Sequence, residues 1–182
     1  MGNVSNVSVG KPNVSGWLFV APKGTTLPTD ATSTLSSTFK DLGFVSEDGI
    51  TNNNSNESDN IKGWGGQIIL TTSTEKVDEF SMTLLEILNE DVLTTVYGST
   101  NVTTGTNTIN VVVNASEVPE HVFVIDVKLT GNSMKRIVIP CGKISEMGEI
   151  VYKDDEPIGY EITISALPDT SGNNHYEYNV KA

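Results

Sequence analysis

The sequence has very little of what nucleic-acid-binding and disulfide-stabilised proteins depend on. Arg136 is the only arginine among 182 residues, and the formal net charge is −12. A protein that grips nucleic acid neutralises phosphates with clustered lysines and arginines and reads bases largely through arginine, so tight or base-specific binding is excluded as a main function. Cys141 is the only cysteine, which excludes an intrachain disulfide. Folding therefore needs no oxidising compartment.

Long hydrophobic runs are also missing. No stretch approaches the roughly 20 apolar residues of a membrane-spanning helix. The polar start, Met1 to Lys11, lacks the basic and apolar regions of a secretory signal. We therefore expect the protein to be made in a cytoplasm and to stay there until it is assembled. With 37% hydrophobic and 19% charged residues, the composition is that of a folded protein rather than a disordered acidic chain.

Residues that carry out catalysis or bind metals are equally scarce. The two histidines, His121 and His175, are not at metal-ligand spacing with each other or with Cys141. No phosphate-binding loop, nucleophile elbow or dinucleotide-binding glycine motif is present. The Asn-, Asp- and Glu-rich stretch 52–60 offers oxygen ligands for Ca²⁺, but it lacks the spacing of an EF-hand. We expect a protein that is not an enzyme and has no cofactor or metal.

What the sequence does contain is many segments with the pattern of β-strands. In 77–84, Phe80, Met82 and Leu84 alternate with polar residues, which predicts one buried and one water-facing side. Hairpins are predicted over 67–84 with a turn at 74–76, over 122–139, and over 143–167. Further strands are predicted at 17–21, 43–46, 108–113 and near Tyr176. Together these strands indicate a mainly β protein, an antiparallel sandwich or barrel.

One α-helix is predicted at 90–97. Asn89 suits the N-cap and Gly98 suits the C′ position. Glu90 and Asp91 favour the positive end of the helix dipole. The apolar stripe that would pack on a sheet consists of Leu88, Val92, Leu93 and Val96. A short helical turn is also expected over 34–39.

The most unusual segment lies between the Asp48-Gly49 turn and Trp64. Residues 51–60 contain no apolar side chain, and a polar loop this long inside a compact domain is usually functional or disordered. Trp64 follows it within a group of glycines, and tryptophan is enriched at protein interfaces. Trp64 therefore either contacts another protein or folds back onto its own core, and the sequence leaves both readings open.

The order of several segments resembles one protein family. These segments are Ser15–Asp30 (SGWLFVAPKGTTLPTD), Leu42–Ile50 (LGFVSEDGI), Lys62–Gly66 (KGWGG) and Leu84–Leu93 (LLEILNEDVL), which runs on to Val96-Tyr97-Gly98. In this order they resemble the major tail tube protein of bacteriophages with long non-contractile tails, the siphophage major tail protein. The resemblance covers the first half of the chain well and the second half only through its strand pattern.

The resemblance implies a mainly β fold of the phage tail tube type, an antiparallel β-sandwich or barrel with one short α-helix and a long inter-subunit loop. Independently of the resemblance, the three Asn-Val-Ser triplets and the Gly and Pro residues at the start of the chain predict a flexible N-terminal arm over 1–14, and the chain length predicts a single domain over 15–182. The implied function is structural: hexameric rings stack into the tail tube that conducts DNA into the host cell. Implied partners are other copies of the chain, a tape measure protein, a tail terminator and tail-tip proteins. DNA would pass without specific binding, and no membrane insertion is implied. The implied location is the virion tail, after synthesis in the host bacterial cytoplasm.

Two sets of residues are predicted to make functional contacts. The resemblance assigns the role of inter-subunit loop to Asn53, Asn54, Ser55, Asn56, Glu57, Ser58, Asp59, Lys62 and Trp64. The water-facing halves of amphipathic strands are candidates for the tube lumen, namely Glu79, Ser81, Thr83, Asp126, Lys128, Glu161 and Thr163. The outer surface of the particle would explain the same alternation.

Three other functions stay open at this point. Strands rich in Thr, Ser and Asn also suit a β-sandwich surface adhesin, although the expected lack of a secretion signal counts against it. The inner tube of a contractile injection machine belongs to the same structural class but would need a surface that faces a sheath. A carboxylate-dependent hydrolase would need a pocket with two close acids.

Overall fold

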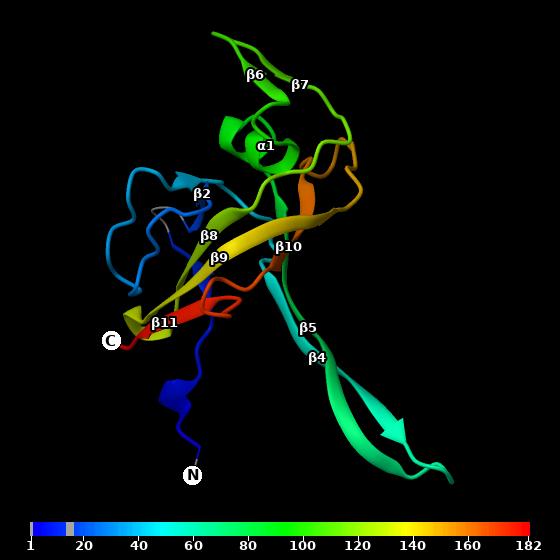
Figure 1. Ribbon diagram of the computed structural model, residues 1–182. Coiled ribbons are helices and arrows are strands. Elements are labelled where there is room, and N and C mark those ends of the chain that lie inside the picture. Colours follow the sequence, from blue (N-terminus) through cyan, green and yellow to red (C-terminus); the bar gives the residue numbers. More distant parts are fainter. Residues whose placement is uncertain (1, 14–16) are drawn as a thin grey trace.

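Antiparallel strands dominate the computed structural model, which describes residues 2–13 and 17–182 (Figure 1). The strands are β1 (Lys11–Pro12), β2 (Leu18–Pro22), β3 (Lys40–Asp41), β4 (Thr51–Lys62), β5 (Ile68–Leu84), β6 (Val102–Thr104), β7 (Ile109–Val111), β8 (His121–Lys128), β9 (Met134–Met147), β10 (Tyr160–Ala166) and β11 (Tyr176–Val180). The helices are α1 (Glu90–Tyr97) and the short 3₁₀ turns η1 (Val4–Asn6) and η2 (Thr130–Asn132).

The predicted N-terminal arm is partly attached to the body. β1 pairs with the end of β8, Lys11 opposite Lys128 and Pro12 opposite Val127. The backbone N–H of Val9 also donates to Thr130 Oγ1 at 3.1 Å. The predicted boundary between arm and domain at 14/15 lies outside the described residues, as does the Ser15-Gly16 that opens the family-like series. The division into arm and domain stays a prediction.

Nine of the strands form one ladder that folds into two layers, and β6 and β7 pair only with each other. The order of the ladder is β3-β2-β8-β9-β10-β5-β4, with β1 added on β8 and β11 on β9. The first half of β9 pairs with β8 and β11, and its second half pairs with β10. Between these two halves of β9 the register with β8 shifts: Phe123 pairs with Ile139, but His121 pairs with Gly142. Pro140 stands at this irregularity, where a missing N–H is tolerated. The result is a β-sandwich whose sheet is not closed into a barrel, which is one of the two architectures that the strand pattern predicts.

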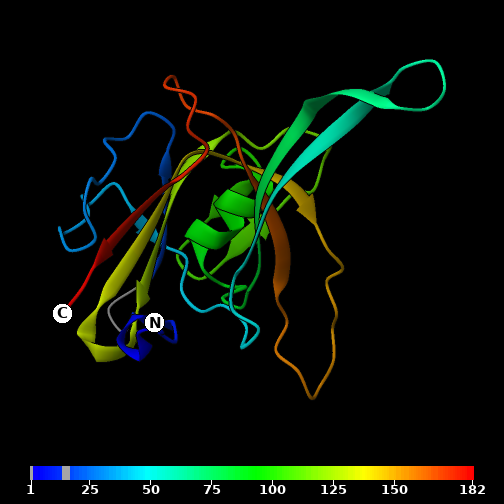
Figure 2. The same ribbon diagram turned by 90° about the horizontal axis from the view of Figure 1, so that it is seen from below.

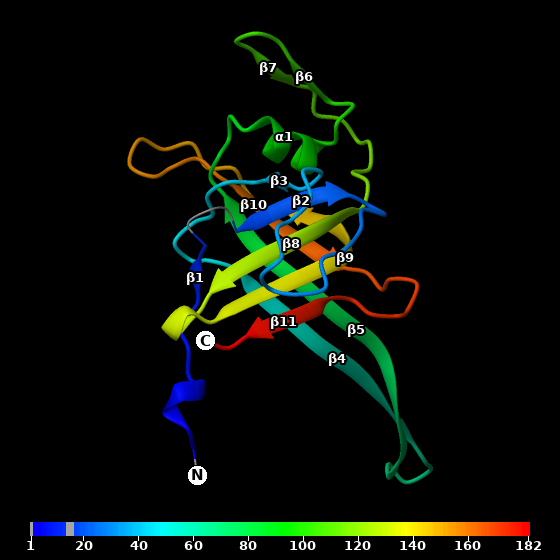
Figure 3. The ribbon, with the colours of Figure 1, turned by 90° about the vertical axis from the view of Figure 1, so that its left-hand side faces the viewer.

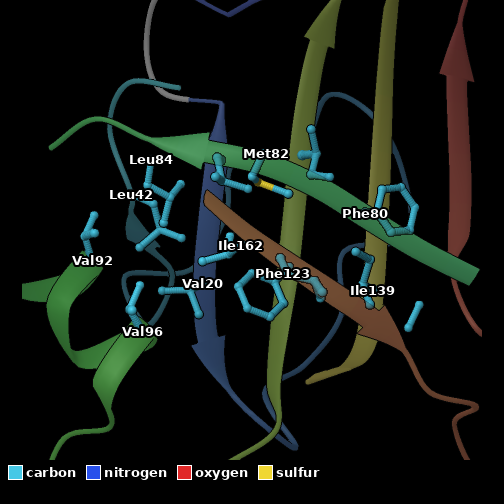
Figure 4. Packing of buried hydrophobic residues seen from close by; sticks show 14 residues of the cluster. Val20, Leu42, Phe80, Met82, Leu84, Val92, Val96, Phe123, Ile139 and Ile162 are labelled. Atoms are coloured by element: carbon cyan, nitrogen blue, oxygen red, sulfur yellow. The ribbon is translucent and has the colours of Figure 1, made fainter. Parts of the chain in front are cut away.

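The core lies between the two layers and follows from the alternation of each strand. Val20 of β2, Phe123 of β8 and Ile139 of β9 point from one layer towards Met82 of β5 and Ile162 of β10 in the other (Figure 4). All five are buried. Burying each such side chain contributes roughly 1.5–3 kcal/mol relative to leaving it exposed. In β5 and β10 every second side chain is therefore left for water or for partners, whereas β8 is buried on both of its faces.

The predicted helix is confirmed with its caps. α1 spans Glu90–Tyr97, the Asn89 side chain accepts a hydrogen bond from the Asp91 N–H at 3.0 Å, and Gly98 has a φ of 88°. Val92, Leu93 and Val96 are buried as expected, but Leu88 is 80% exposed. Leu88 precedes the N-cap, so the helical period does not set its direction. In the described part of the chain, no helix is long and apolar enough to span a membrane.

Several strand predictions are confirmed and others are wrong. The β8–β9 hairpin around Gly131-Asn132-Ser133 and the last strand, β11, are present. The strand predicted over 143–152 is instead the end of β9 and stops at Met147. The helical turn predicted over 34–39 is a single turn, closed by the Phe39 N–H and the Ser36 carbonyl at 3.0 Å. The turn predicted at 74–76 does not exist, because β5 runs unbroken from Ile68 to Leu84.

Candidate assembly surface

A long β-hairpin made of β4 and β5 projects from the sandwich (Figures 1 and 2). Its pairing runs from Thr51 opposite Ser81 to Lys62 opposite Ile68. β5 also pairs with β10, but only from Glu79 to Leu84. Beyond Glu79 the hairpin is therefore a two-stranded ribbon. Within the described chain, both of its outer edges and both of its faces are left uncovered by other strands.

The predicted long loop is this hairpin's first strand, so the expectation of irregular structure over 52–62 is wrong. The residues predicted to bridge subunits from Asn53 to Asp59, together with Lys62, all lie on β4, and all but Ser55 are exposed. Neither face of the ribbon is buried, so the sequence shows no alternation, and Asn and Ser have low strand propensity. Backbone pairing and cross-strand contacts hold the strand, for example Thr71 Oγ1 donating to Asn60 Oδ1 at 2.7 Å. Their role between subunits stays a prediction.

The root of the hairpin is fixed by a buried carboxylate. Asp78 on β5 is 4% exposed, and its Oδ1 accepts a hydrogen bond from the Asn52 side-chain amide at 3.0 Å. Its Oδ2 lies 2.5 Å from Nδ1 of His175, just before β11. The His175 ring meets Phe80 edge to face at a centroid distance of 5.3 Å. These contacts join both hairpin strands to the C-terminal segment and set the direction in which the hairpin leaves the body.

The tip of the hairpin presents Trp64 to solvent. The Gly63 N–H donates to the Gln67 carbonyl at 2.8 Å, and the Gly66 N–H donates to the Gly63 carbonyl at 3.0 Å. Gly65 and Gly66 have φ values of 102° and 85°, which L side chains rarely adopt. Trp64 is fully exposed. The reading in which Trp64 folds back onto its own core is therefore wrong.

The outer part of the hairpin carries a group of exposed apolar side chains, which we call the tip cluster. Its members are Ile61, Trp64, Ile68, Ile69 and Leu70, and the four aliphatic ones are between 47% and 67% exposed. Strand alternation places Ile69 on the opposite face from Ile68 and Leu70, so both faces are apolar. A grouped apolar surface of this kind marks an interaction site. An isolated two-stranded ribbon is also marginally stable in water.

Five of the predicted lumen residues form one polar face, on the outer side of β5 and β10. Thr83 pairs with Glu161 and Ser81 with Thr163, and the two hydroxyls of the second pair lie 3.1 Å apart. Glu79 continues the row, because its Oε1 accepts from Ser165 Oγ at 3.3 Å. We call this surface the β5–β10 polar face; its members are Glu79, Ser81, Thr83, Glu161 and Thr163. Whether it lines a lumen stays a prediction.

Asp126 was predicted to face water, and this is wrong. It is 4% exposed and accepts two hydrogen bonds from Arg136, from Nε at 2.6 Å and from Nη2 at 2.8 Å. Nη1 of Arg136 also donates to the backbone carbonyls of Asp30 and Ser33. The segment 23–39 thus covers this side of β8, which the strand pattern alone could not reveal. Lys128 is exposed but lies on this layer, away from the β5–β10 polar face.

The covering segment is itself organised by Asp30. Its Oδ1 accepts hydrogen bonds from the backbone N–H groups of Ser33 at 2.5 Å and Thr32 at 2.7 Å. These bonds favour the charged carboxylate and lower the pKa of Asp30 to about 2. Arg136, the only arginine of the chain, and the turn at Asp30 therefore stabilise the packing of segment 23–39 on the body.

The arrangement of the side chains gives little support for metal binding or catalysis. Across residues 2–13 and 17–182, no group of three or more His, Cys, Asp or Glu side chains is placed to hold a metal ion. The stretch 52–60 considered for Ca²⁺ is an extended strand, so its oxygens point alternately to two faces and do not converge. Cys141 is buried. The surface with the most distinctive features is therefore the hairpin.

Comparison with known proteins identifies the family. The sequence matches the family model described as phage tail tube protein over residues 6–181, including the second half of the chain. No curated protein matches the sequence. Among solved structures, the chain is similar to the cryo-EM structure of the anti-feeding prophage cap, described as a tube-terminating cap, with 8% identity, 96% of each chain covered and a TM-score of 0.46. The family match spans nearly the whole chain, and the chain belongs to the phage tail tube protein family.

Proposed function

We propose that this protein is the major tail tube subunit of a phage with a long non-contractile tail. Membership of the tail tube family makes it a structural component of the phage tail rather than an enzyme. We further propose that hexameric rings of this subunit stack into the tube through which DNA passes into the host cell. The subunit is made in the host bacterial cytoplasm, and its other partners are a tape measure protein, a tail terminator and tail-tip proteins.

The observation that carries the proposal is the projecting hairpin with its tip cluster. A surface of this size does not stay uncovered in a protein that functions alone, because exposed apolar residues and free strand edges favour association. We propose that the β4 residues Asn53 to Asp59, Lys62 and Trp64 contact neighbouring subunits. A projection on one subunit that binds a different surface on the next gives a heterologous contact, which closes into rings or extends into filaments.

The charge distribution suits a conduit for DNA. Each subunit carries a formal charge of −12, and its only arginine is buried against Asp126. We propose that the β5–β10 polar face lines the lumen, where hydroxyl and carboxylate groups offer phosphates no cationic partner. At physiological salt the repulsion decays over about 8–10 Å, so DNA near the tube axis would be kept from adhering without a large barrier.

Electron microscopy of the concentrated, purified protein tests this proposal. We expect hollow tubes or stacked rings with a central bore. A matched variant replaces 57–75 with Asn-Gly, which closes a short hairpin at the Asn56–Lys76 pair and leaves the root intact. This variant should stay folded and monomeric. Tubes of normal length from the shortened variant would contradict the assembly role of the hairpin, and a wild-type protein that forms neither rings nor tubes, even with tail extract as initiator, would contradict the proposed function.

A further inference from the structure

A pocket on the body has the shape and composition to receive an apolar side chain. It has a volume of about 430 Å³ and is lined by Pro12, Asn13, Trp17, Asp41, Gly43, Phe44 and Glu86. Phe44 forms part of its wall and is 71% exposed, which is unusual for a large aromatic residue in a folded protein. The volume falls within the roughly 300–1,000 Å³ of typical binding pockets and admits a single indole ring. We call it the Phe44 pocket.

The wall of the Phe44 pocket is held in place by specific backbone geometry. Gly43 has a φ of 74°, and a Cβ at this position would meet the Glu86 carboxylate at 2.0 Å. Glu86 can therefore approach closely and accept a hydrogen bond from the Phe44 N–H at 3.2 Å. The Gly43 N–H donates to Asp41 Oδ1 at 2.8 Å. The pocket is formed before any partner arrives, which lowers the entropic cost of binding.

The hairpin tip and the Phe44 pocket are complementary in charge. Asp41 and Glu86 accept hydrogen bonds at the pocket, but neither forms an ion pair within the described part of the chain. Lys62 stands two residues from Trp64 and is likewise not ion-paired among the described residues. A tryptophan with a neighbouring lysine thus matches an aromatic pocket with two carboxylates at its edge.

The two surfaces cannot meet within one subunit. The hairpin tip and the segment 42–50 that carries Phe44 lie on opposite sides of the molecule (Figures 2 and 3). The ribbon is rooted at Asp78 and points away from this segment. A contact between tip and pocket must therefore join two copies. It joins two different surfaces, the tip of one copy and the pocket of the other, and such a heterologous contact can be repeated from subunit to subunit in a ring or a tube.

We propose that Trp64 at the hairpin tip of one subunit binds in the Phe44 pocket of a neighbouring subunit, with Lys62 beside Asp41 and Glu86. This contact rests on the proposed function, because it names the surface that receives the hairpin in the assembled tube. Aromatic side chains in a dry pocket are the usual centre of binding energy at interfaces. The other contacts of the hairpin would then add backbone pairing with strands of the neighbouring subunit and fix how the two subunits are aligned.

Site-specific photo-cross-linking tests the contact in assembled tubes. Phe44 is replaced by p-benzoylphenylalanine, and unlabelled subunits are mixed with ¹⁵N-labelled ones before assembly, irradiation and tryptic digestion. Between Lys62 and Lys76 there is no lysine or arginine, so cleavage releases residues 63–76 as one peptide. We expect mass spectrometry to find this peptide joined to residue 44 in mixed-label pairs. The same label at Tyr152, which is exposed elsewhere on the body, should not capture it.

The outcomes separate the contact from the proposed function. If tubes form but residue 44 captures only other peptides, or nothing, the docking proposal is overturned while the tube function stands. An equal yield of the 63–76 peptide from position 152 also overturns it. If tubes do not form under any condition, the proposed function fails and the contact fails with it.

A pair of truncations gives an independent measure. Phe44 and Leu88 are both apolar and largely exposed, at 71% and 80%, so neither change should unfold the protein. Phe44→Ala should raise the protein concentration needed for assembly at least about tenfold, the effect of an interface hot spot. Leu88→Ala should change it less than about twofold. Equal effects of the two changes would overturn the pocket assignment.

Discussion

The two halves of β5 show how differently the body and the hairpin are stabilised. From Val77 to Leu84 every second residue is buried, and the strand pairs with β10 from Glu79 to Leu84 and with β4 as far as Ser81. From Ile68 to Lys76 every residue is exposed, and the strand pairs with β4 alone. The same strand therefore belongs to a self-sufficient sandwich at one end and to a ribbon that needs a partner at the other. Changes in the body should cost folding stability, whereas changes at the tip should cost assembly.

The largest loss of stability is expected from the centre of the body. Phe123 is fully buried between the layers, and the Cβ position at Gly142 lies 2.6 Å from its ring. Phe123→Ala should lower the free energy of unfolding by about 3–5 kcal/mol, because it removes apolar contacts and leaves a cavity. Urea unfolding followed by circular dichroism measures this. A loss below about 1 kcal/mol would show that the layers do not pack as described.

A similar loss is expected when the buried ion pair is broken from one side. Arg136→Met leaves Asp126 charged, buried and unpaired, and it releases the carbonyls of Asp30 and Ser33. We expect a loss of about 3–5 kcal/mol in the free energy of unfolding. The double variant Asp126→Leu with Arg136→Met should recover much of it. If the double variant is no more stable than the single one, the cost lies in the covering segment 23–39 rather than in the unpaired charge.

An intermediate effect is expected at the root, where body and hairpin join. Asp78→Ala removes the acceptor shared by Asn52 and His175, and we expect a loss of about 1–3 kcal/mol. Hydrogen exchange should speed up first in the backbone N–H groups of β4, because the hairpin loses its attachment. A uniform increase over β8 and β9 as well would show that Asp78 supports the whole sandwich.

A smaller, pH-dependent effect is expected at Asp30. Hydrogen bonding lowers the pKa of this carboxylate from 3.8 to about 2, so its stabilising contribution is present above about pH 4 and is lost as the pH falls towards 2. Asp30→Asn should lower the melting temperature slightly at neutral pH. The difference from the wild type should shrink between pH 4 and pH 2. A difference that stays constant over this range would contradict the role of the charge.

The smallest effect on stability is expected at the tip. Trp64 is fully exposed, so Trp64→Ala should change the free energy of unfolding by less than about 0.5 kcal/mol. Assembly into tubes should nevertheless be lost. A marked fall in the melting temperature of the monomer would mean that Trp64 supports the fold. It would contradict the claim that the body determines folding stability and the hairpin tip determines assembly.

The parts of the fold that sequence reasoning predicted carry strong local signals. The helix α1 combines its caps with an apolar stripe, and the β8–β9 hairpin combines two apolar runs with the turn Gly131-Asn132-Ser133, although β8 is buried on both faces. β4 could not, because neither of its faces is buried and its Asn and Ser residues do not favour strands. The burial of Asp126 depends on a cover supplied from 23–39, far away in the sequence. Asp78 and His175 could not be identified from the sequence as the root of the hairpin, since a buried carboxylate is visible only once its partners are placed.

A cryo-EM structure of tubes assembled from the wild-type protein would show whether the hairpins join the subunits. We expect every hairpin to cross to a neighbouring subunit, with Trp64 covered there and with the β5–β10 polar face exposed to the lumen. A tube whose hairpins lie free in solvent or fold against their own bodies, while the subunits are joined by other surfaces, would contradict the assembly role of the hairpin.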